Sequence, residues 1–203
     1  MIINAIANFV TSIISHLGYP GVFLLMALES ACIPIPSEII MPFSGFLVTT
    51  GQFNFWAIVI VGSLGNLAGS FLACWIGYTG GRSLVEKYGR YILLSQRDLE
   101  SSDRFFRKYG QSTVFFSRLL PIIRTFISLP AGISKMDFKK FSLYTFLGVI
   151  PFTAVLTYAG VKLKENWTAL QPYFHKFDLI IAIVIVLVVI WFVFRHLKRT
   201  NNG

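Results

Sequence analysis

The chain has 203 residues, of which 55% are hydrophobic and only 13% carry a charged side chain. Soluble domains carry about 25% charged residues, so this composition excludes an ordinary soluble protein and indicates a single integral membrane domain over residues 1–203. The net charge is +9. The basic residues cluster between apolar runs, so we expect membrane lipids with anionic headgroups as partners and no nucleic acid.

The first expected element is an amphipathic helix over residues 2–17. Its apolar residues recur at helical spacing on one face, and polar residues line the other face. The sequence Gly18-Tyr-Pro-Gly21 then interrupts the helical pattern. The pattern leaves open whether this helix spans the membrane or lies on its outer surface.

An apolar stretch over residues 22–48 is interrupted by Glu29-Ser-Ala-Cys-Ile-Pro-Ile-Pro-Ser-Glu38. A charged side chain at the bilayer centre costs roughly 2.5 to 3.5 kcal/mol. Pro34 and Pro36 remove backbone donors and break a helix. Broken backbone persists at membrane depth only where protein or a water-filled cavity satisfies its polar groups. The interruption therefore indicates a functional site.

Two half-length apolar runs surround this interruption, and each is too short to cross a bilayer. They predict a re-entrant helical hairpin over residues 22–50, with Pro42 and Gly45 as further breaks where it closes. A full transmembrane helix is expected over residues 54–80. The hydrophilic, basic segment 82–110 follows, and the positive-inside rule places it in the cytoplasm as one or two amphipathic surface helices.

The apolar run over residues 111–136 repeats this theme with the opposite charge. Ser117-Arg-Leu-Leu-Pro-Ile-Ile-Arg124 contains Pro121, and Leu129-Pro-Ala-Gly132 adds breaks at Pro130 and Gly132. We expect a second re-entrant hairpin over 111–136, followed by a transmembrane helix over 138–161. A last transmembrane helix is expected over residues 179–194, with a basic, cytoplasmic C-terminus.

An internal repeat relates these elements. Phe53-Asn-Phe55 resembles Met136-Asp-Phe138, and glycines follow at matching intervals, with a constant offset of 83 residues. The matched glycines are Gly65 with Gly148 and Gly77 with Gly160. Repeat 1 then covers residues 18–81 and repeat 2 covers 111–161. The charges flanking the spans orient the repeats in opposite directions, which predicts an all-α inverted-repeat fold. The alternative is a chance coincidence of aromatic residues and glycines.

The two hairpin tips should face one another across a cavity. Arg118 and Arg124 can hold a lipid phosphate, because a guanidinium donates two hydrogen bonds at once. A carboxylate in a medium of low dielectric can take up and release a proton, so Glu29 and Glu38 are candidates for proton coupling or gating. A purely structural alternative is that Glu38 and Arg124 form a fixed buried ion pair that locks the hairpins together.

Three stretches together resemble the DedA family, also called the SNARE-associated or VTT-domain family. They are the Ile-Pro-Ile-Pro-Ser-Glu core, the arginine motif Ser117-Arg-Leu-Leu-Pro-Ile-Ile-Arg-Thr125 and Pro130-Ala-Gly-Ile-Ser-Lys-Met136. Leu119 stands where the family usually has phenylalanine. The resemblance implies transport of undecaprenyl phosphate or phosphatidylethanolamine across the bacterial cytoplasmic membrane by a multi-pass protein, in dependence on the proton-motive force. It also implies functional roles for Glu29, Glu38, Arg118 and Arg124.

The main hypothesis is therefore a flippase-like transporter of a phosphate-bearing lipid, with undecaprenyl phosphate first. The alternatives are a phosphatidylethanolamine flippase and a membrane-homeostasis protein that transports no lipid. An enzyme such as a lipid phosphatase is disfavoured, because the three histidines lie far apart and none has metal-ligand spacing. We expect no catalytic residue, cofactor or metal. The oligomeric state, a homo-oligomer included, stays open.

Overall fold

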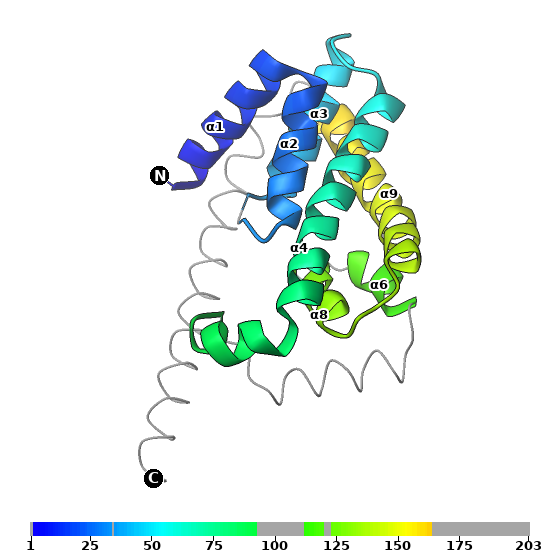
Figure 1. Ribbon diagram of the computed structural model, residues 1–203. Helices are drawn as coiled ribbons and strands as arrows, with labels where there is room; N and C mark the ends of the chain where they lie inside the picture. Colours follow the sequence, from blue (N-terminus) through cyan, green and yellow to red (C-terminus); the bar gives the residue numbers. More distant parts are fainter. Residues whose placement is uncertain (1, 34, 93–111, 120–122, 164–203) are drawn as a thin grey trace.

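The computed structural model describes residues 2–33, 35–92, 112–119 and 123–163, and these ranges are helical without a strand (Figure 1). The helices are α1 (Ile2–Leu17), α2 (Tyr19–Ser30), α3 (Ser37–Thr49), α4 (Phe55–Ile92), α6 (Ser112–Arg118), α7 (Ile123–Phe126), α8 (Ser128–Ile133) and α9 (Phe138–Leu163). The predicted helix 179–194, the segment 93–110, Pro34 and Pro121 lie outside the described residues.

Helix α1 occupies the residues of the predicted amphipathic helix. Val10 and Ile14 on its apolar face are fully buried and join a core cluster with residues of α2 and α3. Phe9 and Leu17, which were expected on the same face, remain more than half exposed. Gly18 follows with φ of 64°, a left-handed conformation that glycine adopts without steric cost. The chain can therefore turn directly from α1 into α2.

Helices α2 and α3 meet at the acidic break, which is the interruption from Glu29 to Glu38. Helix α2 ends at Ser30, and α3 begins at Ser37, directly after Pro36 in an extended conformation. The prediction that Pro42 and Gly45 break the helix is wrong, because α3 runs through both residues. Pro42 removes the hydrogen bond that residue 42 would donate within the helix, but the packing of α3 on α9 holds its flanking turns in place.

The second predicted hairpin contains three short helices. Helix α6 is followed by a turn at Leu119, and a turn at Ile127 separates α7 from α8. Pro130 and Gly132 were expected to break a helix, but α8 runs through both. Pro130 is the third residue of α8, where the backbone N–H has no partner within the helix, so proline is tolerated there.

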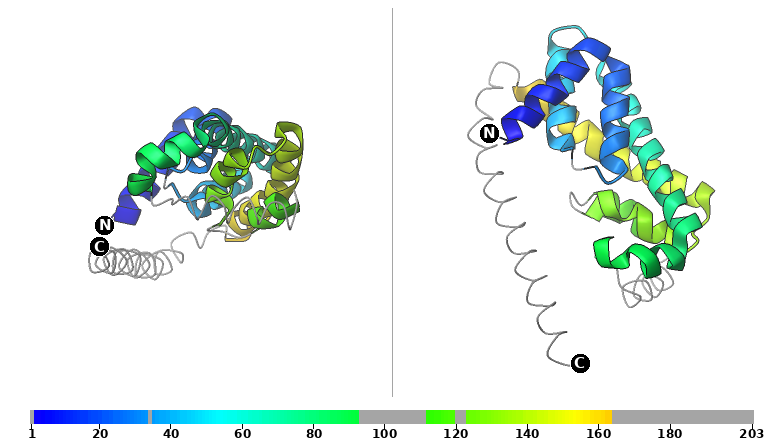
Figure 2. Two further views of the ribbon diagram at one scale, coloured as in Figure 1. Left: turned by 60° about the horizontal axis from the view of Figure 1, so that its bottom comes forward. Right: turned by 60° about the vertical axis from the view of Figure 1, so that its left-hand side comes forward.

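The two long helices cover the predicted spans. Residues Phe55–Gly80 of α4 and Phe138–Leu163 of α9 are long and apolar enough to cross a membrane. They run in opposite directions (Figures 1 and 2). Ser63 Oγ of α4 and Thr153 Oγ1 of α9 are hydrogen-bonded at 3.0 Å in the interior. Helix α4 continues to Ile92, so the first part of the predicted amphipathic segment is helical, and it turns away from the long axis (Figure 1).

Helix α3 packs on α9 through glycines that bring the two backbones together. A Cβ atom added to Gly45 would collide with the carbonyl oxygen of Thr157. A Cβ atom added to Gly160 would collide with the carbonyl oxygen of Pro42. Small residues allow such close backbone approach between helices in a membrane.

Helix α8 packs on α4 by the same device. A Cβ atom added to Gly132 would collide with the carbonyl oxygen of Cys74, and one added to Gly77 would collide with that of Leu129. Helix α2 also packs on α4, and α6 packs on α9. Each long helix therefore carries one short helix from each hairpin region. This arrangement brings the break between α2 and α3 close to α7, where the charged residues meet.

Candidate functional site

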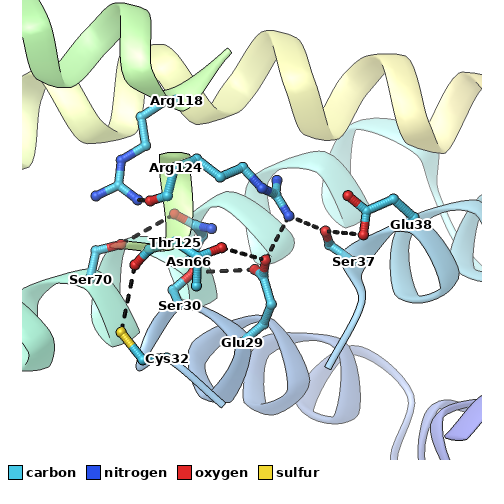
Figure 3. Close-up of polar contacts among 10 residues, drawn as sticks. All are labelled: Glu29, Ser30, Cys32, Ser37, Glu38, Asn66, Ser70, Arg118, Arg124 and Thr125. Atoms are coloured by element: carbon cyan, nitrogen blue, oxygen red, sulfur yellow. Dashed lines mark hydrogen bonds and ion pairs between the residues drawn. The ribbon is translucent and has the colours of Figure 1, made fainter. Parts of the chain in front are cut away.

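Arg124 lies at the centre of a polar cluster between α2, α3 and α7 (Figure 3). Its side chain is buried, with only 1% of the residue exposed. Nη2 donates a hydrogen bond to Oε1 of Glu29 at 2.7 Å, which also makes this contact a salt bridge. Nη2 also donates to Oγ of Ser37. Both hydrogens of Nη2 are thereby used by residues on the two sides of the acidic break.

The other two nitrogens of the Arg124 guanidinium do not use their hydrogens in hydrogen bonds within the described part of the chain. Its Nε and Nη1 are buried and have no hydrogen-bond partner among the described residues. One face of the group lies against the ring of Phe152 on α9, with the guanidinium carbon 4.0 Å from the ring centre. A buried donor without a partner costs about 1 to 3 kcal/mol, more when it is charged. These donors can therefore gain free energy by binding an anionic oxygen.

Glu29 is buried near the C-terminal end of α2. Its Oε1 accepts a second, longer hydrogen bond from Thr125 Oγ1 at 3.4 Å, and its Oε2 accepts one from Ser30 Oγ at 3.4 Å. Asn66 and Ser70 of α4 are buried nearby, and Ser70 Oγ donates to Asn66 Oδ1 at 3.4 Å (Figure 3). The carboxylate thus lies among polar groups, and its charge is balanced by Arg124.

Arg118 is fully buried on the side of Arg124 that faces away from Glu29 (Figure 3). Its Nη1 donates to the backbone carbonyl of Arg124 at 2.5 Å. Its Nη2 donates to Ser128 Oγ of α8 at 2.8 Å and to Thr145 Oγ1 of α9 at 3.3 Å. Arg118 thus contacts the main chain of Arg124, and its Nη atoms are occupied by protein oxygens.

Glu38 has a different environment from the other three predicted site residues. It is exposed, and its Oε2 accepts a hydrogen bond from Ser37 Oγ at 3.4 Å. The structural alternative of a fixed buried ion pair between Glu38 and Arg124 is wrong, because the buried ion-pair partner of Arg124 is Glu29. Glu38 lies in the first turn of α3, where free backbone N–H groups favour a carboxylate. Ser37 occupies the position that faces the guanidinium.

Sequence reasoning missed several residues that complete the site. Ser37 and Thr125 adjoin the predicted charged residues within the quoted motifs, so this adjacency could have indicated them. Thr145 and Ser128 are hydroxyl residues in otherwise apolar stretches, which is a weaker signal. Phe152 carries no signal of its own, because an aromatic residue in a transmembrane helix usually faces lipid or core.

The sequence places the chain in a known family. Residues 35–162 match the VTT domain. The chain belongs to the VTT-domain family. The matched range includes Glu38, Arg118 and Arg124 and begins after Glu29. The resemblance to the DedA proteins is thereby confirmed.

Two relatives of this VTT-domain protein come from Bacillus subtilis strain 168. The uncharacterized membrane protein YkoX is 40% identical over 92% of this chain and 83% of its own length. Undecaprenyl phosphate transporter A is 33% identical over 92% of both chains. The alkaline phosphatase-like protein of Lactococcus lactis strain IL1403 is 29% identical over 97% of this chain and 96% of its own length. No solved structure matches the chain. The relatives and the two apolar helices agree on a membrane protein.

Proposed function

We propose that this VTT-domain protein is a membrane lipid transporter that moves a lipid with a phosphate headgroup, undecaprenyl phosphate first. The observation that carries the proposal is the buried Arg124 guanidinium, which holds Glu29 with Nη2 and keeps Nε and Nη1 without a partner among the described residues. Arginine binds phosphate oxygens in the same geometry as a carboxylate. The transporter named for undecaprenyl phosphate, 33% identical, supports this choice of substrate.

The architecture we propose is a pair of inverted repeats, each with a re-entrant hairpin and a transmembrane helix. The opposite directions of α4 and α9 support it (Figure 2). The glycine contacts support it further, because the contacts of α3 on α9 recur between α8 and α4 with equivalent partners. Positions on α4 and α9 differ by 83 residues, and those on α3 and α8 by 87. The matched contacts are Gly45 with Thr157 and Gly132 with Cys74, then Gly160 with Pro42 and Gly77 with Leu129.

In the mechanism we propose, the lipid phosphate and the Glu29 carboxylate replace one another as the binding partner of Arg124. In the resting state Glu29 balances the buried guanidinium. When the phosphate binds, it takes over this balance, and Glu29 takes up a proton so that no free carboxylate stays buried. Neither state then leaves the charge of Arg124 or of Glu29 buried without a counter-charge, which would cost several kcal/mol. Proton uptake and release at Glu29 would couple lipid movement to the proton gradient.

Glu38 has a separate part in this mechanism. Its exposed carboxylate lies at the start of α3, next to Ser37, which contacts Arg124. We assign it to proton entry and to gating of the acidic break. An exposed carboxylate exchanges protons with water without a desolvation cost. For a buried carboxylate, the charged form carries that cost. We propose that the protein lies in the bacterial cytoplasmic membrane, across which such a gradient exists.

Reconstitution in liposomes tests this function. The assay measures translocation of labelled undecaprenyl phosphate and of labelled phosphatidylethanolamine, with and without a pH gradient, and also measures free phosphate. We expect faster movement of undecaprenyl phosphate, acceleration by the gradient and no release of phosphate. Preferential movement of phosphatidylethanolamine would change the substrate. No movement of either lipid would contradict the transport function, and release of free phosphate would indicate an enzyme.

A further inference from the structure

We propose that Arg118 is a positioning residue for Arg124 and does not itself bind the lipid phosphate. This inference rests on the proposed function insofar as it concerns the lipid. Its structural half concerns α7 alone and can be tested without any lipid. It assigns different roles to two arginines that lie six residues apart in the motif and that the sequence alone does not distinguish.

The contacts of Arg118 point to this role. Its Nη atoms donate to three oxygens on three different helices: the Arg124 carbonyl on α7, Ser128 on α8 and Thr145 on α9. No part of the residue is exposed. Among the described residues Arg118 lacks a partner only at Nε, whereas Arg124 lacks partners at both Nε and Nη1. An incoming phosphate would find two nitrogens without partners on Arg124, whereas on Arg118 it would find only Nε unless it displaced protein acceptors.

The proposed repeat relation supplies a second, independent argument. A Cβ atom on Gly65 would lie 3.1 Å from Met26 Cβ and would collide with the Phe23 carbonyl oxygen. A Cβ atom on Gly148 would lie 2.9 Å from both Arg118 Cβ and the Phe115 carbonyl oxygen. Gly148 follows Gly65 by 83 residues, so the position of Met26 in repeat 1 is that of Arg118 in repeat 2.

The neighbours of these two residues correspond as well. In repeat 1, a Cβ atom on Gly62 would lie 2.8 Å from Sδ of Met41 and 3.9 Å from Cγ of Met26. The equivalent positions in repeat 2 are Thr145 and Ser128, the two side chains that accept hydrogen bonds from Arg118. They follow from the offsets of 83 and 87 residues.

The same packing site therefore occurs in both repeats, with different side chains in each. In repeat 1 it is an apolar cluster of two methionines on a glycine, and in repeat 2 it is an arginine with two hydroxyl groups. Packing alone does not require the charge, because the apolar version packs in the same geometry, and burying a charge is costly. What the polar version adds is a donor for the Arg124 carbonyl. That contact ties the short helix α7 to α8 and α9 and so fixes where the Arg124 guanidinium points.

The test uses the full chain in lipid nanodiscs and two variants. The first, Arg118→Met/Ser128→Met/Thr145→Gly, transfers the apolar cluster of repeat 1 into repeat 2. The second, Ser128→Ala/Thr145→Val, keeps both arginines and removes two of the acceptors that hold Arg118. Amide hydrogen exchange of residues 123–126 is measured first, without added lipid phosphate. We expect faster exchange there in both variants and unchanged exchange in α4. Unchanged exchange at residues 123–126 in both variants would overturn the positioning role.

Binding of undecaprenyl phosphate to the same samples tests the second half. We expect both variants to bind more weakly than wild type but to retain measurable affinity, whereas Arg124→Gln abolishes binding. Under direct binding by Arg118, Ser128→Ala/Thr145→Val would bind as tightly as wild type, and the triple variant would lose binding as completely as Arg124→Gln. That pair of results would overturn the inference. Absence of binding by wild type would instead contradict the proposed function, and the exchange measurement would still decide the role of Arg118.

Discussion

Arg124 and Glu29 are 95 residues apart in the chain and meet in a buried ion pair of 2.7 Å. The pair joins α2 to α7, so it connects the acidic break to the arginine motif. Its second consequence is chemical. A buried guanidinium that depends on one carboxylate for charge balance can exchange that carboxylate for another anion, and a lipid phosphate is such an anion.

The ion pair between Glu29 and Arg124 should contribute strongly to the free energy of unfolding. Removing one partner of a buried pair costs about 3 to 5 kcal/mol, because the remaining charge stays buried alone. We therefore expect Glu29→Gln and Arg124→Gln each to destabilise the protein by about this amount, and the double variant to recover part of the loss. The measurement is unfolding in mixed micelles. Glu38→Gln is the matched control, because Glu38 is exposed and its substitution should change stability by less than about 0.5 kcal/mol. An equal loss from Glu38→Gln would contradict the observed pairing.

Phe152 should contribute to the same site through its ring. The Arg124 guanidinium lies 4.0 Å from the ring centre, and a desolvated cation–π contact contributes about 2 kcal/mol. We expect Phe152→Leu to reduce both stability and transport, and Phe152→Tyr, which retains the aromatic ring, to preserve most of each. Unfolding and lipid translocation are measured on both variants. Equal behaviour of the leucine and tyrosine variants would show that the aromatic ring does not contribute.

A methyl group added to a glycine should destabilise the protein where that glycine lies against the backbone of another helix. Gly132→Ala places its Cβ against the carbonyl oxygen of Cys74 and 2.9 Å from the amide nitrogen of Tyr78, so α8 must move off α4. Overpacking of this kind costs about 1 to 3 kcal/mol. Gly62→Ala is the control, because its Cβ meets the flexible end of Met41 and that side chain can shift. Unfolding in mixed micelles should show a clear loss for Gly132→Ala and a small one for Gly62→Ala. The reverse order would contradict the packing.

The hydrogen bond between Ser63 and Thr153 should couple the two long helices. The two hydroxyl oxygens are 3.0 Å apart in the interior. Interhelical hydrogen bonds of this kind in membranes contribute about 0.6 kcal/mol on average. A double-mutant cycle with Ser63→Ala and Thr153→Val should give a coupling free energy near that value. Thr153 Oγ1 also bonds to carbonyls of its own helix, so the single substitutions alone would mislead. A coupling of zero would mean that the contact stabilises nothing.

Sequence reasoning located the site through the cost of its charges. Glu29, Arg118 and Arg124 were predicted because each is expensive in an apolar run, and the structure brings these three together. The choice between Glu29 and Glu38 as partner of Arg124 was not predictable in the same way. It depends on how the chain turns between α2 and α3, where Cys32 adopts φ of 68°, and no residue pattern specifies that turn.

Prolines and glycines were the weaker guides to local structure. Pro42 and Pro130 both lie inside helices, because neighbouring helices and the first-turn position of Pro130 offset the missing backbone donor. Gly45 and Gly132 serve close packing on the long helices instead of breaking the short ones. The glycines matched between the repeats were the more useful signal, since each of the four lies against a backbone carbonyl oxygen of a neighbouring helix: Gly65, Gly77, Gly148 and Gly160.

Translocation of undecaprenyl phosphate by the variant Glu29→Gln/Arg124→Gln tests the central claim most directly. Both charges of the pair are removed together, so neither partner is left as a lone buried charge and the protein should remain folded. Loss of the charged hydrogen bonds to phosphate should lower the transport rate by about ten- to a hundredfold relative to wild type. Glu38→Gln removes the proposed proton entry but none of these hydrogen bonds, so it should still move undecaprenyl phosphate but lose the acceleration by a pH gradient. A folded double variant that moves the lipid at the wild-type rate would contradict the account.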